Sequence, residues 1–327
     1  MALLLTEEDV KALLTMDDLI ETMGLALADF SARGVTQPVR TVLQIGEQGA
    51  FYGLMPAWMP SRPALGTKLV TVFESNAQRD LPTHLATIVL LDPETGALLA
   101  LMDGRYLTEA RTAAVSALSV RHLSRENASV LAIIGSGVQA RSHLEAISLV
   151  RDLSDVRVWS PNRARVEAFV KDARPHSRAR MSAAGSAQAA VQDADIVVLV
   201  TSAKDPVVRS EWIAAGAHVC AVGACRPTHR EMEAALVARG ELYVDSREAA
   251  LVEAGDIVLA MNEGIIGAAH IKGELGEVVP KPGEGRSPAD TRVTIFKSLG
   301  LAVEDVAAAH LVHQRALDAG RGMEFVL

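Results

Sequence analysis

Short apolar runs alternate with segments of helical period in the second part of the chain, from about residue 130. Such alternation is typical of parallel strands covered by helices on both faces of a sheet. It predicts an α/β domain with a doubly wound parallel sheet. The runs that read as strands are 129–135, 156–160, 194–202, 217–224 and 242–246. The segments that read as helices are 139–150, 163–173 and 232–240.

The first 115 residues follow a different pattern, with two amphipathic helices expected at 6–14 and 16–34. The Leu run ahead of them is interpreted as the lead-in to the first helix. Pro93 and Gly96, in the sequence DPETG, predict a hairpin turn between two of the strands that follow. These elements indicate a separate α+β unit. Its strands are expected at 38–46, 65–74, 84–92 and 97–103.

A long helix at 108–123 leads from this unit into the parallel sheet, and a helix at 301–320 is expected to pack back on the first unit. We therefore expect one domain of residues 1–115 together with 300–327. Residues 116–299 are expected to form the other. A mobile loop is expected at 281–290, which is rich in Pro and Gly.

Composition narrows the class of protein. The chain has 327 residues, 49% hydrophobic and 22% charged, which suits a globular protein of two domains. No apolar run has the roughly 18 residues of a membrane span, and no signal peptide is recognised, so a cytoplasmic location is expected. The net charge of −8 disfavours nucleic acid as a partner. Cys220 and Cys225 lack the spacing of a zinc site or disulfide framework, and no metal is expected.

The sequence IGSGVQA carries a candidate cofactor site. Gly135, Gly137 and Ala140 form a G-x-G-x-x-A motif directly after an apolar run and at the start of a helix. The first Gly allows a tight turn, the second lets the backbone approach a pyrophosphate, and Ala lets the helix pack closely. The motif predicts a Rossmann-type dinucleotide site, with a purely structural turn as the alternative. Thr201 and Ser202 join this site because they end a parallel strand, where ligands of α/β folds bind.

The end of the second strand of this domain bears on which dinucleotide binds. An NAD enzyme generally has Asp or Glu there, but this chain has Ser160, followed by Asn162 and Arg163. A hydroxyl and a guanidinium suit a 2′-phosphate, since no carboxylate repels it. NADP(H) is therefore predicted, and NADH is less favoured. The alternative is that Arg163 and Arg165 are ordinary solvated charges on a helix.

Three cations are candidates for holding a small anionic substrate. Lys68 lies on an otherwise apolar strand, Arg40 lies in the expected strand 38–46, and Arg111 lies in the long helix. Each alone reads more readily as a surface charge. Together they would form a clamp for a carboxylate.

Several phrases carry a resemblance to a known family, among them TKLVTVFE, LTEARTAAVSA, IGSGVQARSH, VGACRPTHREM and TIFKSLGLAVED. The chain resembles the ornithine cyclodeaminase/mu-crystallin family over nearly its whole length, and most closely the mu-crystallin branch. Members of that branch act as NADPH-dependent ketimine reductases and bind thyroid hormone in vertebrates. The resemblance implies a homodimer in which strands of the first domain meet across the interface. The first domain would bind substrate and mediate dimerisation, and the second would bind NADP.

The resemblance also implies roles for particular residues. Arg40, Lys68 and Arg111 would hold the substrate carboxylate or approach its reacting carbon, and Lys68 or His84 would deliver the proton. Cys225 would line the nicotinamide pocket, with a buried, inert thiol as the alternative. The cofactor contacts that the resemblance and the motif together imply are Thr83, His84, Arg111, Thr112, Gly135, Gly137, Val138, Gln139, Ser160, Asn162, Arg163, Thr201, Ser202 and Cys225.

Two departures from the cyclodeaminase pattern bear on the reaction. Ornithine cyclodeaminases resemble this chain but have an acid/base Asp where it has Cys225, and a Glu for the substrate amine where it has Gly53. We therefore expect reduction of cyclic ketimine carboxylates such as pyrroline-2-carboxylate or piperideine-2-carboxylate. The alternatives are reductive amination of an open-chain keto acid, as in the alanine dehydrogenases of this family, then cyclodeamination, then cofactor or ligand binding without turnover.

Overall fold

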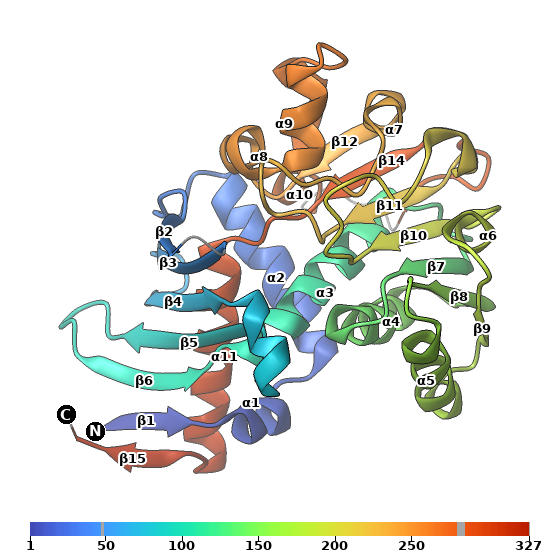
Figure 1. Ribbon diagram of the computed structural model, residues 1–327. Helices are drawn as coiled ribbons and strands as arrows, with labels where there is room; N and C mark the ends of the chain where they lie inside the picture. Colours follow the sequence, from blue (N-terminus) through green and yellow to red (C-terminus); the bar gives the residue numbers. More distant parts are fainter. Residues whose placement is uncertain (47–48, 280–284, 327) are drawn as a thin grey trace. The chain divides into compact units, whose positions relative to one another are not determined.

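The computed structural model of the chain describes residues 1–46, 49–279 and 285–326 (Figure 1). The chain divides into two compact units, Met1–Arg111 with Gly300–Leu327, and Thr112–Leu299. The first boundary falls inside α3 (Arg105–Leu123). Of the loop expected at 281–290, residues 281–284 lie outside the described part of the chain. Among the described residues, no helix has both the length and the apolar character to span a membrane.

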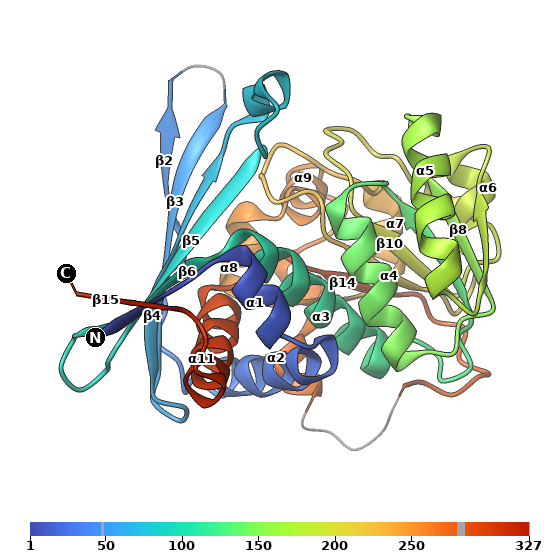
Figure 2. The ribbon, with the colours of Figure 1, turned by 90° about the horizontal axis from the view of Figure 1, so that it is seen from below.

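The first unit contains a seven-stranded sheet in the order β15-β1-β6-β5-β4-β3-β2. Its neighbouring strands are antiparallel except β1 and β6, which are parallel. Figure 2 shows α1, α2 and α11 together on one side of this sheet. The strands are β1 (Ala2–Leu5), β2 (Thr41–Ile45), β3 (Ala50–Met59), β4 (Ala64–Val72), β5 (His84–Leu91), β6 (Leu98–Asp103) and β15 (Met323–Phe325). The helices are α1 (Glu7–Leu13), α2 (Met16–Ser31), α11 (Ala302–Ala319) and the short η1 (Glu74–Arg79).

Most of the elements predicted for this unit are confirmed. The hairpin between β5 and β6 turns at Gly96, whose φ is +72°, and the Asp92 carboxylate accepts hydrogen bonds from the backbone of Glu94 and Thr95. The C-terminal helix α11 packs on α2 and on β3, β4 and β5, as expected.

Three strands of this unit were missed: β1, β3 and the three-residue β15, which pairs with β1. The N-terminal Leu run is not a lead-in to a helix but β1, because the capping box of Thr6 and Asp9 begins α1 only at Glu7. β3 contains Pro56, a residue that is disfavoured inside a strand. Pro56 lies opposite Thr67 of β4, but the pairing of β2 with β3 ends at Leu54, so β3 is an edge strand on that side at Pro56.

The second unit contains an eight-stranded, all-parallel sheet in the order β13-β12-β14-β11-β10-β7-β8-β9. The strand order reverses at β7, which lies between β8 and β10. The strands are β7 (Val130–Ile134), β8 (Asp155–Trp159), β9 (Arg180–Ala183), β10 (Ile196–Leu199), β11 (His218–Ala221), β12 (Glu241–Val244), β13 (Ile271–Glu274) and β14 (Thr294–Lys297). The helices are α4 (Val138–Val150), α5 (Arg163–Ala173), α6 (Ala187–Val191), α7 (Ala234–Arg239), α8 (Arg247–Glu253), α9 (Gly255–Asn262) and α10 (Leu275–Val278). Three short 3-10 helices complete the unit: η2 (Arg174–His176), η3 (Ser210–Trp212) and η4 (Ala268–His270).

Both faces of this sheet are covered, which confirms the doubly wound α/β fold. On one face, Ile134 and Leu199 belong to a buried cluster with Val191 of α6 and Leu236 of α7. On the other face, Nε2 of His218 in β11 and the Ser119 hydroxyl of α3 form a hydrogen bond of 3.0 Å. The sequence reading missed β9, β13 and β14, because these four-residue strands mix polar and apolar positions.

Candidate functional site

The glycine-rich turn lies between β7 and α4, the strand-turn-helix setting that the sequence predicted. Gly135 has a φ of +130°, and a Cβ there would lie 2.6 Å from the carbonyl oxygen of Val200, so only glycine fits. Gly137 caps α4, and a Cβ there would have no atom within 4 Å, which leaves its backbone open to a ligand. Ala140 is fully buried beneath the turn.

The first turn of α4 provides a further test of fit to a dinucleotide. Val138 is 52% exposed beside the open backbone of Gly137. The Oε1 atom of Gln139 is buried and has no hydrogen-bond partner among the described residues. Because dinucleotides carry ribose hydroxyl donors, and because the N-terminus of a helix favours phosphates, this segment fits such a group.

At the carboxyl end of β8, the Ser160 hydroxyl lies 2.9 Å from that of Ser136 in the glycine-rich turn. Asn162 caps α5 by accepting a hydrogen bond from the backbone of Arg165. Asp155, the acidic residue of β8, begins the strand and so lies at the end opposite Ser160. The carboxyl end of β8, where an NAD enzyme generally has Asp or Glu, carries Ser160 instead.

Arg163 is well exposed, and its Nε donates a 2.8 Å hydrogen bond to Glu167 one turn along α5. The structure thus shows Arg163 in a surface ion pair of modest strength. A bound anion would have to compete with Glu167 for this guanidinium.

Thr201 and Ser202 follow β10, at the carboxyl edge of the sheet. The backbone N–H and the hydroxyl of Thr201 both donate to Oε1 of the buried Glu231, at 2.7 Å each, whereas Ser202 is exposed. Cys225 is exposed as well, so the alternative interpretation of Cys225 as a buried, inert thiol is wrong, whereas Cys220 is buried.

In the first unit, the predicted cations Lys68 and Arg111 meet at one buried carboxylate. The Nζ of Lys68 lies 2.5 Å from Oδ2 of Asp305, and the Nε of Arg111 lies 2.8 Å from Oδ1 of the same residue. Nη1 of Arg111 also lies 2.7 Å from Oε2 of Glu304. All four side chains are at most 5% exposed. Buried charges of this kind persist only when they are paired.

Arg40 joins the same cluster through Gly300. Its Nη2 donates a 2.8 Å hydrogen bond to the carbonyl of Gly300. Gly300 has a φ of +78°, and a Cβ there would lie 2.3 Å from Nη1 of Arg111. The structure therefore brings the three predicted cations together around the start of α11.

Burial and charge set the protonation states in this cluster. Burial, opposed by Asp305 and reinforced by Arg111, lowers the pKa of Lys68 to about 8. Burial, together with Lys68 and Arg111, lowers the pKa of His84 to about 4. Burial alone would raise the pKa of Asp305, but Arg111 and Lys68 hold it below its ordinary value. At neutral pH, Lys68 is thus an ammonium and His84 a neutral imidazole.

Sequence reasoning missed Asp305, Glu304 and Glu231. Two acidic residues in the first turn of a helix are typical of a surface charge that complements the helix dipole, so Glu304 and Asp305 gave no distinct signal. A lysine on a buried strand needs a buried acidic partner, so Lys68 itself was the signal that such a partner exists elsewhere in the chain.

Three of the expected cofactor contacts belong to the first unit: Thr83, His84 and Arg111. Thr83 is exposed and directly precedes β5. Thr112 is buried on α3, in the second unit. The other expected contacts all belong to the second unit.

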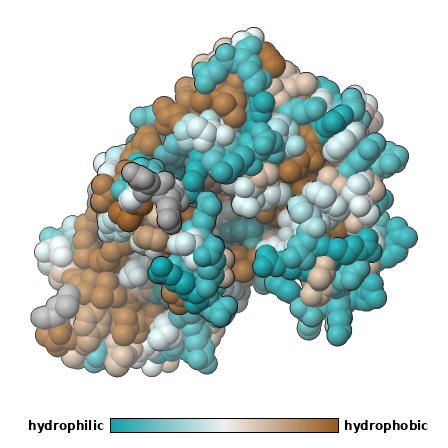
Figure 3. Space-filling view, viewed as in Figure 1, coloured by the Kyte–Doolittle hydropathy of each residue, from teal (hydrophilic) through white to brown (hydrophobic). Residues whose placement is uncertain are grey.

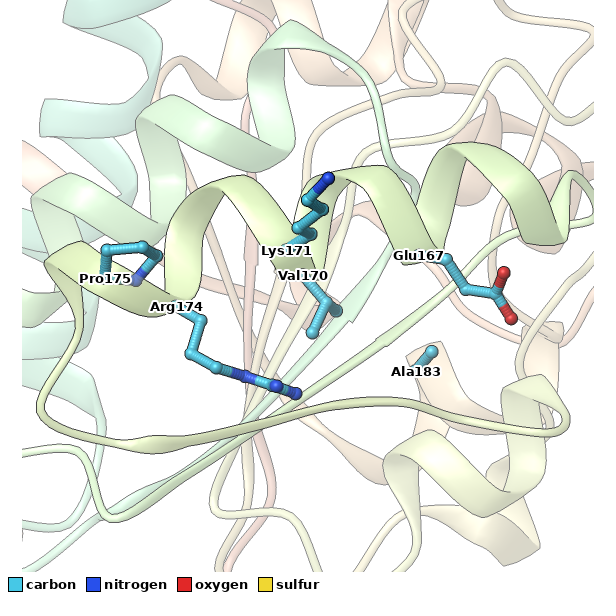
Figure 4. Close-up of a pocket in the computed structure, with 6 residues that line it drawn as sticks. All are labelled: Glu167, Val170, Lys171, Arg174, Pro175 and Ala183. Carbon is cyan, nitrogen blue, oxygen red and sulfur yellow. The ribbon is translucent and has the colours of Figure 1, made fainter.

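A pocket of about 380 Å³ lies elsewhere, between α5 with η2 and the end of β9 (Figure 4). It is lined by Glu167, Val170, Lys171, Arg174, Pro175 and Ala183. None of the predicted site residues lines it. Among the described residues, no cluster of three or more His, Cys, Asp or Glu side chains is arranged to hold a metal ion.

Comparison with known proteins adds to this geometry. Residues 1–320 match the model of the ornithine cyclodeaminase/mu-crystallin family. The chain is 44% identical over 299 residues to ketimine reductase mu-crystallin of Rattus norvegicus, covering 90% of this chain and 91% of that protein. The fold is similar to Δ1-pyrroline-2-carboxylate reductase of Thermococcus litoralis in complex with NADH and L-proline, with a TM-score of 0.95, 35% identity, and coverage of 99% of this chain and 100% of that one. It is also similar to an archaeal alanine dehydrogenase dimer with bound NAD, with a TM-score of 0.93, 31% identity and 99% coverage of each chain.

Proposed function

Because the chain belongs to the ornithine cyclodeaminase/mu-crystallin family, we propose that it reduces cyclic ketimine carboxylates to cyclic L-amino acids with NADPH. The chain is an oxidoreductase that uses a nicotinamide cofactor and acts on C=N or C–N bonds. The substrates proposed are of the pyrroline-2-carboxylate or piperideine-2-carboxylate type. The observation that carries the proposal is the buried cluster in which Lys68 and Arg111 share Asp305.

The charge balance of this cluster favours an anionic substrate. Arg40, Lys68 and Arg111 supply three cations, and Glu304 and Asp305 supply two carboxylates. One positive charge is left in excess. A substrate carboxylate would neutralise it by binding at Arg40 and Arg111, whose planar guanidinium groups match its geometry.

Lys68 is the proposed proton donor. A bound nicotinamide supplies the hydride to the imine carbon. Lys68, an ammonium at neutral pH, would give its proton to the imine nitrogen, so that C=N becomes CH–NH. His84 lacks the acidic imidazolium proton at neutral pH, because its pKa lies near 4. The role of His84 would be to pack beside the ring of the cyclic imine.

The preference for NADPH over NADH is part of the proposal. It is supported by Ser160 at the end of β8 and by the exposed Arg163 within the first turn of α5. The T. litoralis reductase is in complex with NADH, so NADH is the competing cofactor against which this preference is tested.

Reductive amination of a keto acid is the second candidate, since the archaeal relative is an alanine dehydrogenase. It would use the same cations. Cyclodeamination is disfavoured by Cys225 and Gly53, because neither supplies a carboxylate. Gly53 faces Val70 on β4, and a Cβ at Gly53 would lie 2.9 Å from the Cγ1 of Val70, so the strand leaves little room for an acidic side chain there.

We also propose that the protein forms a homodimer through the outer face of the seven-stranded sheet. Along β3, Met55, Ala57 and Met59 are buried while Leu54 is 37% exposed, and Leu4 and Leu85 are exposed to a similar degree. Figure 3 shows hydrophobic surface over the strands at the left of the view. An apolar sheet face of this kind is typical of a dimer interface, and the archaeal relative is a dimer.

The test is the loss of NADPH absorbance with pyrroline-2-carboxylate and piperideine-2-carboxylate, run beside NADH and beside pyruvate with ammonia or methylamine. We expect turnover of a cyclic imine, faster with NADPH. Turnover only with pyruvate and an amine would move the function to reductive amination. The absence of turnover with every substrate would favour a binding protein instead.

A further inference from the structure

The ends of β10 and β11 are joined by a side chain that the proposed reaction does not use. The two strands pair in parallel as far as Leu199 and Ala221. Beyond that point, Oε1 of Glu231 accepts the backbone N–H and the hydroxyl of Thr201, both at 2.7 Å. Oε2 of Glu231 accepts the backbone N–H of Gly223 at 2.7 Å and that of Ala224 at 3.2 Å. One carboxylate therefore replaces the strand pairing where the ladder stops.

The polarity of these bonds is fixed by their donors. The Thr201 hydroxyl accepts a hydrogen bond from the backbone of Ala203 and donates to Glu231. Glu231 is the acceptor in its hydrogen bonds with Thr201, Gly223 and Ala224, which suits an ionised carboxylate rather than a carboxylic acid. Burial raises the pKa of Glu231; Lys297 and the Thr201 donors lower it and Asp256 raises it further, and the net direction is upward.

A second buried layer holds Glu231 in place. Oδ1 of Asp256 accepts hydrogen bonds from the backbone of Glu231 at 2.8 Å and of Met232 at 3.0 Å. Oδ2 of Asp256 lies 3.2 Å from the Nζ of Lys297, at the end of β14. Glu231, Asp256 and Lys297 are all at most 1% exposed. The carboxyl ends of β10, β11 and β14 are thus tied together by three buried charges.

The backbone around the loop between β11 and Glu231 is closely packed at two glycines. A Cβ on Gly223 would lie 2.0 Å from the carbonyl oxygen of Thr201. A Cβ on Gly255 would lie 1.9 Å from the carbonyl oxygen of His229 and 2.4 Å from that of Arg226. Cys225 lies in this loop, so its position depends on the same anchors.

We propose that Glu231 is a positioning residue for the cofactor, holding Thr201, Ser202 and the Cys225 loop at the carboxyl edge of the parallel sheet. The inference rests on the proposed binding of a nicotinamide dinucleotide at this edge. Glu231 touches no expected substrate residue. Its effect passes through the strand ends, and it therefore acts on cofactor affinity.

Glu231→Gln is the test variant, because its amide NH₂ would face backbone donors that now meet a carboxylate oxygen. The dissociation constant of NADPH is measured by fluorescence, beside the melting temperature and the KM of the imine. We expect NADPH to bind about tenfold more weakly, the effect of losing one or two charge-assisted hydrogen bonds. The KM of the imine at saturating NADPH should stay within about twofold of the wild type, because the residues proposed to bind the imine are unchanged.

Glu233→Gln is the matched control. Glu233 lies two residues further on, is partly exposed, and accepts a hydrogen bond from the backbone of Ser210. It should leave NADPH affinity unchanged. A folded Glu231→Gln variant with wild-type NADPH affinity would overturn the proposal, as would an equal loss in Glu233→Gln.

Asp256→Asn serves if Glu231→Gln does not fold, because it removes the charge paired with Lys297 and weakens the two hydrogen bonds that hold the backbone at Glu231, without altering a cofactor contact. A loss of about threefold in NADPH affinity supports the proposal, and none overturns it. The wild type is assayed first with cyclic imines and with NADPH and NADH. Failure of that assay counts against the proposed function, whereas an unchanged variant beside an active wild type counts against the role of Glu231 alone.

Discussion

Lys68 and Arg111 share a single carboxylate, because Asp305 places one oxygen 2.5 Å from the ammonium and the other 2.8 Å from the guanidinium. A bridging carboxylate fixes the spacing of the two cations before any substrate arrives. Buried ion pairs contribute little net stability, since desolvation offsets their attraction. We infer that this cluster is kept for the geometry it imposes on the cations.

The first prediction concerns the pH dependence of reduction. The ammonium form of Lys68 exists below its pKa of about 8, so kcat/KM for the imine should fall as pH rises through that value. Asp305 raises the pKa of Lys68, and Asp305→Asn should therefore move this fall to lower pH. Asp318→Asn, an exposed residue on the same helix, is the control and should leave the profile unchanged. Superimposable profiles for wild type and Asp305→Asn would remove Lys68 as the proton donor.

The second prediction isolates the contact of Gly300 with Arg111. Gly300→Ala and Gly96→Ala both put a side chain at positive φ, which costs about 1–2 kcal/mol. Only at Gly300 would the new Cβ also meet Arg111. Gly300→Ala should therefore reduce kcat/KM by up to roughly 100-fold, whereas Gly96→Ala should lower the melting temperature alone. Equal activities in the two variants would show that Arg111 does not position the substrate.

The third prediction addresses cofactor preference. Arg163→Ala should raise the KM of NADPH by about tenfold, the worth of a charge-assisted contact, and leave the KM of NADH nearly unchanged. Ser160→Asp should repel a 2′-phosphate and favour NADH. Steady-state kinetics with both cofactors provides the internal control. If Arg163→Ala affects both cofactors equally, its pair with Glu167 is only a surface ion pair.

The fourth prediction concerns the two thiols. Burial raises the pKa of Cys220 to about 12, whereas Cys225 is exposed. A thiol reagent should therefore modify one cysteine per native chain and both after unfolding. Bound NADPH should slow the modification, and Cys225→Ser should abolish it. Rapid labelling of native Cys225→Ser would contradict the burial of Cys220.

The fifth prediction tests the outer face of the first sheet. Leu54→Glu together with Leu85→Glu should turn a dimer into a monomer, because each puts a charge on the apolar face. Leu149→Glu, at an exposed position of α4, is the matched control. Light scattering gives the mass of each variant. A wild-type monomer, or a double variant that stays dimeric, would exclude this face as the interface.

The amino-acid pattern alone determined the parallel sheet, the glycine-rich turn, the hairpin at Gly96 and the two long helices of the first unit. These features are local, since period, capping and turn chemistry are written in consecutive residues. The strands β1, β3, β9, β13, β14 and β15 were missed because they are short or carry polar residues or, in β3, Pro56. Their pairing comes from neighbours distant along the chain.

Tertiary structure alone decided the partners of the predicted cations and of the strand ends. Asp305 and Glu304 lie more than 190 residues from Arg111, and they read as ordinary helix-start acids until the fold buries them against it. The role of Glu231 likewise depends on the ends of β10 and β11 lying side by side, which the sequence alone does not show. The chain's own pattern thus indicates which residue types carry charge, whereas burial decides which charges must meet, because an unpaired charge in the interior is too costly to keep.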